Sequence, residues 1–300
     1  MAVGLTRSSG SAAETVARLG STYHRTHYAA DPIAATVDGV PGYDDSMPDP
    51  SRDADDRRMQ ELADLTTELA EVDDQELGGE DWLSHQTLAR LLRYELNARR
   101  YALSEVAISA SVAGVFPAIV SSIPLASVGT VPAAQAYLAR LGEVGEFFDR
   151  LGARHLQAVA AGRMPTELGV RQALAQLDAY LSAPPAADPL LAPTPGAGVD
   201  ADRWHDQASE LVTTSIRPAL ARYRHTLATH LLPVGRSDSA VGVCHIPDGP
   251  NGYLAAVRAH TTTELTPDEI HRVGLGLVAR LRDEFAERGQ RALGTSDVTE

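Results

Sequence analysis

Histidine and carboxylate side chains are the residues of this sequence that could bind a metal, but their spacing does not form a metallopeptidase helix. Such a helix carries His-Glu-x-x-His, which places two imidazoles one turn apart and a general base beside the metal-bound water. The 300-residue sequence has ten histidines and lacks this pattern. The pairs that come nearest to it are His24 and His27, His225 and His230, and Asp268 and His271. Each pair lacks the further ligands that a metal site needs, so we predict no metal ligand and no catalytic residue in this chain.

The sequence gives equally little support to nucleophilic catalysis. All 26 basic residues are arginine, which excludes Schiff-base, P-loop and Ser-x-x-Lys chemistry, because each needs a lysine. The neighbours Cys244 and His245 would point to opposite faces of an extended segment, which separates a thiol from its base. We therefore predict that Cys244 is a buried, inert side chain.

The same cysteine bears on location. A single cysteine permits no internal disulfide, which is typical of a protein from a reducing compartment. Residues 1–10 contain no apolar stretch of the kind that a secretory signal peptide needs. These two observations predict a cytoplasmic protein.

The acidic charge of the chain is concentrated in one region. The formal net charge is −14, and residues 31–81 hold 17 acidic side chains against three arginines, which accounts for the whole excess. An acidic surface repels phosphate backbones, so we predict that nucleic acid is not a partner.

Apolar residues recur at helical spacing along most of the chain and predict an all-α fold. Only 5% of the residues are aromatic, which favours helix packing through small and aliphatic side chains. We expect a multi-helix array of long antiparallel helices with at most one short strand or hairpin, near 241–246. The expected helices cover 12–28, 51–73, 81–104, 132–161, 166–181, 201–232 (with a kink at Pro218) and 267–291.

Residues 106–139 contain no charged side chain, so their length alone would allow a membrane span. Three prolines (Pro117, Pro124 and Pro132) and several serines argue against one. We therefore predict no membrane segment and interpret the stretch as a buried helix–turn–helix or the wall of a cleft. If residues 106–128 are left uncovered, their apolar surface would promote self-association.

The domain organisation follows from composition. The whole chain, 1–300, reads as one helical region, and its proline-rich residues 183–199 predict a flexible connector. Residues 241–300 form a C-terminal helical unit with an unusually complete helix start. There Thr266 is a good N-cap, Pro267 suits the first helical position, and Glu269 can close a capping box with Thr266.

Two motifs in the sequence resemble a known family. The first runs Asp31-Pro-x-x-Ala35-Thr-x-x-Gly39 and then Tyr43-Asp-x-x-Met47-Pro-Asp-x-Ser51. The second runs Gly242-x-x-x-Ile246-Pro-Asp-Gly249-x-x-x-Tyr253 and then His260-Thr-Thr-Thr-x-Leu-Thr-Pro-Asp-Glu-Ile-His-x-Val-Gly274. Their residues and separation resemble the bacterial family catalogued as domain of unknown function 885, over nearly the whole chain.

The resemblance implies a helical, zinc-metallopeptidase-like hydrolase in which this chain corresponds to the half before the metal-binding helix. It implies zinc in the complete family architecture but no cofactor here, because no position of this chain matches a metal ligand. The chain would form part of a cleft for a peptide-like substrate, with Tyr253, His260, Thr261 and Thr262 as candidate cleft residues. Whether the chain is an enzyme stays open, because it lacks the metal motif. The alternative is a stand-alone helical binding or scaffold protein without catalytic activity.

Overall fold

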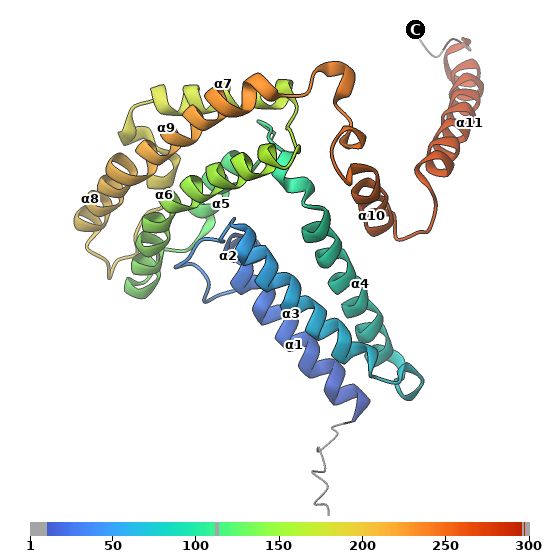
Figure 1. Cartoon of the computed structure of the whole chain (residues 1–300), viewed down its shortest axis with the longest axis horizontal. Coiled ribbons are helices and arrows are strands. Elements are labelled where there is room, and N and C mark those ends of the chain that lie inside the picture. Colours follow the sequence, from blue (N-terminus) through green and yellow to red (C-terminus); the bar gives the residue numbers. More distant parts are fainter. Residues whose placement is uncertain (1–10, 112–113, 296, 298–300) are drawn as a thin grey trace, which may run out of the picture.

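The computed structural model describes residues 11–111, 114–295 and 297, and within them all regular secondary structure is helical (Figure 1). The extended pairing found in these residues is an isolated parallel bridge between Thr166 and Arg236. The predicted all-α fold is therefore confirmed. Residues 1–10, in which we noted no signal-peptide-like apolar stretch, lie outside the described residues.

The N-terminal part is a bundle of three long helices, α1 (Ala12–Ala30), α3 (Arg52–Ala70) and α4 (Gly79–Tyr101). A short helix, α2 (Pro32–Val37), lies between α1 and α3 within the predicted loop. Ser51, the first residue of the helix expected at 51–73, is the N-cap of α3 and accepts a hydrogen bond from the Ala54 amide at 3.2 Å. Leucines of α3 and α4 form the shared core with α1, and the buried set is Val16, Leu19, Leu62, Leu65, Leu69, Leu77, Leu88 and Leu92.

A second, larger core is built by five helices: α5 (Val115–Ser122), α6 (Val131–Ala160), α7 (Glu167–Ser182), α8 (Ala201–Leu211) and α9 (Arg217–Thr226). A π-helical segment, Val212–Ile216, joins α8 to α9, and a second one, Leu227–Leu231, extends α9. The predicted kink site, Pro218, follows the first π-helical segment and lies in the first turn of α9, where a missing N–H is tolerated.

Residues 183–199, expected to be a flexible connector, join α7 to α8 and are packed against the second core. Leu190 is fully buried, and its carbonyl accepts a hydrogen bond from the Tyr137 hydroxyl at 2.7 Å. The buried Asp188 accepts a hydrogen bond from the Tyr180 hydroxyl at 2.6 Å. The Gly196 amide donates to the Val128 carbonyl at 3.1 Å. The prolines here lie in two short 3₁₀ turns, Pro185–Ala187 and Pro189–Leu191, and the Asp188 side chain caps the second by accepting from the Leu190 amide at 3.1 Å.

The uncharged stretch at 106–139 contributes to the second core. Ile108, Phe116, Ile119 and Ile123 are buried there, while Leu125 is 64% exposed. The described apolar side chains of 106–128 are thus mostly buried in the second core, so this stretch leaves little apolar surface uncovered. Among the described residues, no helix is long and apolar enough to cross a membrane.

The C-terminal unit contains α10 (Gly249–Thr261) and α11 (Pro267–Leu293). The candidate strand near 241–246 is instead a 3₁₀ turn, Val243–His245, and Cys244 within it is exposed, so its predicted burial is wrong. The predicted capping box at the start of α11 is confirmed. Glu269 accepts from the Thr266 amide at 2.8 Å and donates its own amide to the Thr266 hydroxyl at 3.3 Å. The Thr266 amide and hydroxyl both donate to the Glu269 carboxylate, which lowers the pKa of Glu269.

Helix α11 stands apart from the other helices (Figure 1) and contributes no residue to either core. Its apolar side chains recur at four-residue spacing, which places them along one face. Val273, Leu277, Leu281 and Phe285 on this face are between 42% and 62% exposed. Helix α11 therefore presents a row of exposed apolar side chains along one face.

A buried histidine links α6 to α9. His155 is 3% exposed, and its Nδ1 lies 3.0 Å from the Glu105 carbonyl, so Nδ1 carries the proton. Its Nε2 lies 3.2 Å from the Tyr223 hydroxyl and accepts that hydrogen bond. Burial lowers the pKa of His155 from 6.5 to about 4, because the charged imidazolium loses its hydration.

We predict that His155 makes the protein less stable as the pH falls from 6.5 to 4. In this window the unfolded chain binds a proton that the folded chain excludes, so the free energy of unfolding falls with pH. The loss attributable to His155 is about 3 kcal/mol over the window. Denaturant unfolding of the wild type and of His155→Gln, whose side chain does not titrate, measures it.

The His155→Gln variant should show a flatter dependence of unfolding free energy on pH than the wild type. His205→Gln, at an exposed position of α8, is the matched control and should follow the wild type. Equal slopes for the wild type and His155→Gln would contradict the assignment.

Candidate functional site

Helix α10 packs along α4, although the two helices are separated by about half of the chain. The close approach depends on Gly252. A Cβ at this position would lie 3.0 Å from the Cβ of Tyr101 and 3.1 Å from a methyl group of Leu103. Both distances are tighter than ordinary van der Waals contact, so a larger residue would push α10 away from α4.

The turn before α10 has a backbone that few residues can adopt. Asp248 has φ +58° in the left-handed region, and a Cβ on the next residue, Gly249, would lie 1.6 Å from the Val243 carbonyl oxygen. Glycine is therefore required at 249 by the fold of the turn. Ile246 is 4% exposed and anchors the same turn in the protein.

Arg163, in the loop after α6, fastens this turn to the end of α4. Its guanidinium donates to the carbonyls of Tyr101 (2.6 Å), Ala102 (2.9 Å) and Pro247 (2.9 Å). Its Nε donates to the Glu105 carboxylate at 2.9 Å. One side chain thus connects the C-terminus of α4, the following 3₁₀ turn and the start of α10.

Glu105 is the centre of these contacts. Its side chain is 2% exposed. Its carboxylate forms ion pairs with Arg52 (2.9 Å), Arg154 (2.7 Å) and Arg163 (2.9 Å). We call these four residues the Glu105 cluster. Because a buried carboxylate requires compensating charge, the cluster fixes the relative positions of α3, α6 and the segment that holds α10.

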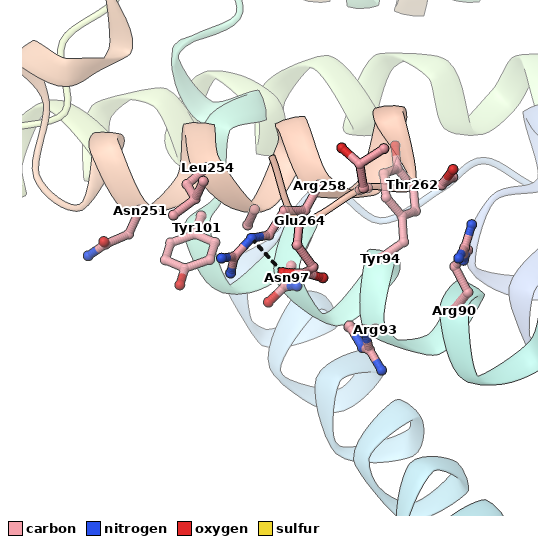
Figure 2. Close-up of a pocket in the computed structure, with 13 residues that line it drawn as sticks. Arg90, Arg93, Tyr94, Asn97, Tyr101, Asn251, Leu254, Arg258, Thr262 and Glu264 are labelled. Atoms are coloured by element: carbon pink, nitrogen blue, oxygen red, sulfur yellow. Dashed lines mark ion pairs between the residues drawn. The ribbon is translucent and has the colours of Figure 1, made fainter. Parts of the chain in front are cut away.

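Between α4 and α10 lies a groove of about 510 Å³, which we call the α4/α10 groove (Figure 2). Helix α4 lines one side and helix α10, with the turn after it, lines the other. The volume lies within the range of small-molecule and peptide pockets. Its lining residues are Arg90, Arg93, Tyr94, Asn97, Tyr101, Asn251, Leu254, Ala255, Arg258, Ala259, Thr262, Thr263 and Glu264.

Most polar groups in the groove are available to a ligand. The Asn97 and Asn251 amides and the Tyr94 and Tyr101 hydroxyls make no hydrogen bond to the described part of the protein. Across the groove the Arg258 guanidinium pairs with Glu264 at 3.1 Å, and Figure 2 shows this pair in the middle of the groove. An amide can donate and accept at once, so these groups match the polar atoms of a peptide bond.

The four residues predicted to line a cleft are only partly brought together. Thr262 caps the C-terminus of α10 in the left-handed region and lines the groove. His260 packs edge-on against Tyr94, with ring centroids 5.7 Å apart, and lines a smaller adjoining cavity of about 230 Å³. Tyr253 is 50% exposed. The Thr261 hydroxyl donates to the Val257 carbonyl at 2.8 Å, which caps the helix.

Sequence reasoning missed the residues that contribute most to the groove. Asn97 and Asn251 are the two asparagines of the whole sequence, and both line the groove. On α4, Arg90, Arg93 and Asn97 follow a spacing of three and four residues, which defines one helix face. These signals were present in the sequence, but nothing local indicated that the two helices meet.

The structure does not provide a metal site in this part of the chain. No group of three or more His, Cys, Asp or Glu side chains in the described residues could hold a metal ion. The donor set that zinc hydrolysis requires is therefore not assembled by these residues, and we derive no catalytic step from them.

The fold and the groove define an all-helical protein with a polar cleft between two helices distant in sequence. The family model described as "Bacterial protein of unknown function (DUF885)" matches residues 32–300, and the chain belongs to this family. Among curated proteins, none matches the sequence.

A solved structure with a similar fold is that of a protein from Colwellia psychrerythraea, described as a "putative lipoprotein". The TM-score is 0.81 at 18% sequence identity. The match covers 96% of this chain and 52% of the other chain, so this chain spans about half the length of that structure. At this identity the likeness supports the fold alone.

Proposed function

We propose that this chain forms the N-terminal helical part of a peptidase-like hydrolase and supplies one wall of its substrate cleft. The observation that carries the proposal is the α4/α10 groove, with its ligand-sized volume and its unengaged side-chain amides and hydroxyls. Thr262 lines this wall, and His260 lines the adjoining cavity. For Tyr253 and Thr261 a place in the cleft remains a prediction.

The lining of the groove suits a peptide-like ligand. Tyr94 and Tyr101 offer aromatic faces on which side chains can pack, and their hydroxyls can donate or accept hydrogen bonds. Asn97 and Asn251 lie on different helices, so one extended backbone could meet both amides. This combination of aromatic faces and neutral amides is typical of peptide binding and not of phosphate-backbone binding.

The catalytic groups would come from outside this chain. In this proposal, the part of the family architecture that lies outside this chain supplies the zinc, the general base and the electrophilic groups. The half-length match to the Colwellia psychrerythraea structure is consistent with such a larger architecture. A cytoplasmic location remains part of the proposal, on the grounds of the single cysteine.

A second candidate is a stand-alone helical binding or scaffold protein, and helix α11 favours it. Leu277, Leu281 and Phe285 present an apolar face that no described residue covers. A face of this kind usually packs against another helix, so the chain would bind a second copy of itself through α11.

The groove should bind short peptides even without catalytic groups. We expect fluorescein-labelled tetrapeptide pools to bind the wild type in fluorescence anisotropy, and Asn97→Ala/Asn251→Ala to weaken binding at least about tenfold, since two ligand amides lose their partners. Gln157→Ala removes an exposed amide from α6 and serves as the control. Absence of binding by the wild type would refute the groove as a cleft wall.

The α11 face should drive self-association. Light scattering at rising protein concentration should show dimers of the wild type and monomers of Leu277→Gln/Leu281→Gln/Phe285→Gln. The unfolding free energy should change little, because none of the three side chains is buried in the core. Arg282→Gln/Glu287→Gln on the same helix is the control. A wild type that stays monomeric at high concentration would exclude this route.

A further inference from the structure

The α4/α10 groove is positively charged in a protein of net charge −14. Its charged lining residues are Arg90, Arg93, Arg258 and Glu264, which leaves a balance of +2. Positive charge within a cleft of an acidic protein produces a local positive potential, which attracts anions to the cleft. The charge balance of the groove is therefore opposite in sign to that of the whole chain.

Two of the three arginines have no partner in the protein. Arg258 is paired with Glu264, but neither Arg90 nor Arg93 makes a hydrogen bond or ion pair within the described part of the chain. By contrast, the arginines of the Glu105 cluster are all engaged by a carboxylate. The groove thus holds two guanidinium groups whose donors are free for a ligand.

Arg90 lies at one end of the groove, and Arg93 lies nearer its middle (Figure 2). In Figure 2, Arg90 lies beside Tyr94 and Thr262 at one end, and Asn251 lies beside Tyr101 at the other. Arg90 and Arg93 are three residues apart on α4, so their side chains project from the same helix face. A ligand that meets the arginines with its charged end would place its body along Asn97.

Resting on the function proposed above, we propose that Arg90 and Arg93 bind the carboxylate of a peptide-like ligand, and that the groove selects ligands carrying one. A planar guanidinium matches a carboxylate in two parallel hydrogen bonds. A dianionic phosphate suits the site less well, because α10 ends there at Thr262 and directs the negative end of its dipole to the groove.

The carboxylate could be the C-terminal group of a peptide or an acidic side chain, and three peptide pools distinguish these sources. All are fluorescein-labelled tetrapeptides: one ends in a free carboxylate, one in an amide, and one in an amide with glutamate as its last residue. Binding of each is measured by fluorescence anisotropy to the wild type and to Arg90→Gln/Arg93→Gln. Arg203→Gln, an exposed arginine of α8 without an ion pair, is the matched control.

We expect at least one of the carboxylate-bearing pools to bind the wild type about tenfold more tightly than the neutral amide pool, and this preference to vanish in the double variant. The variant should keep the weaker affinity for the amide pool, because its amides and tyrosines are intact. Whichever carboxylate pool is preferred identifies the source. Arg203→Gln should behave as the wild type.

The contrary results separate this inference from the function proposed above. Equal affinity for all three pools overturns carboxylate recognition and leaves the peptide groove standing. A fourth pool carries a phosphorylated residue and ends in an amide. If this pool binds more tightly than both carboxylate pools, carboxylate recognition is also overturned. No binding of any pool overturns the groove as a peptide cleft, and carboxylate recognition with it. Both arginines are exposed, so unchanged unfolding midpoints are expected for the variant.

Discussion

The structure depends on one buried carboxylate, Glu105, and the three guanidinium groups around it. Burying a carboxylate without partners is costly, and removing one member of such a buried group typically costs about 3–5 kcal/mol. Arg52 and Arg154 bring the start of α3 and the C-terminal part of α6 to this point. Arg163 adds the carbonyls of the α4 terminus and of Pro247. The cluster therefore joins the two cores and holds α10 on α4, which creates the groove.

Two buried arginines hold parts of the two family motifs in place. The second motif contains Gly249 and the Pro247 carbonyl, which the turn before α10 and Arg163 require. The first motif surrounds Arg140, which is fully buried and donates to the carbonyls of Ser46 and Pro32 and to the Thr36 hydroxyl. Both motifs fix irregular backbone against α6 or the loop that follows it. In this chain the second motif, through Pro247 and Gly249, holds the turn that leads into α10 and so contributes to the groove.

Local signals in the sequence predicted the helices well, and non-local contacts limited everything else. The caps Ser51 and Thr266 were predictable because a cap involves residues only three positions apart. The 46% exposure of Trp82 on α4 could not be predicted, because it depends on which other helices pack against α4. The pairing of Glu105 with Arg163 and the meeting of Asn97 with Asn251 join distant segments. No periodicity reports such contacts, so the candidate site was only partly predictable.

Hydrogen–deuterium exchange of α10 tests most directly whether the Glu105 cluster builds the groove. In Arg163→Met the aliphatic stem remains, but the hydrogen bonds to Glu105, Tyr101 and Pro247 are lost. The account predicts that α10 amides exchange at least about tenfold faster than in the wild type, because α10 can leave α4, while amides of α9 keep their protection. Arg171→Met, in an exposed pair on α7, should leave both helices unchanged. Unaltered protection of α10 in Arg163→Met would contradict the account.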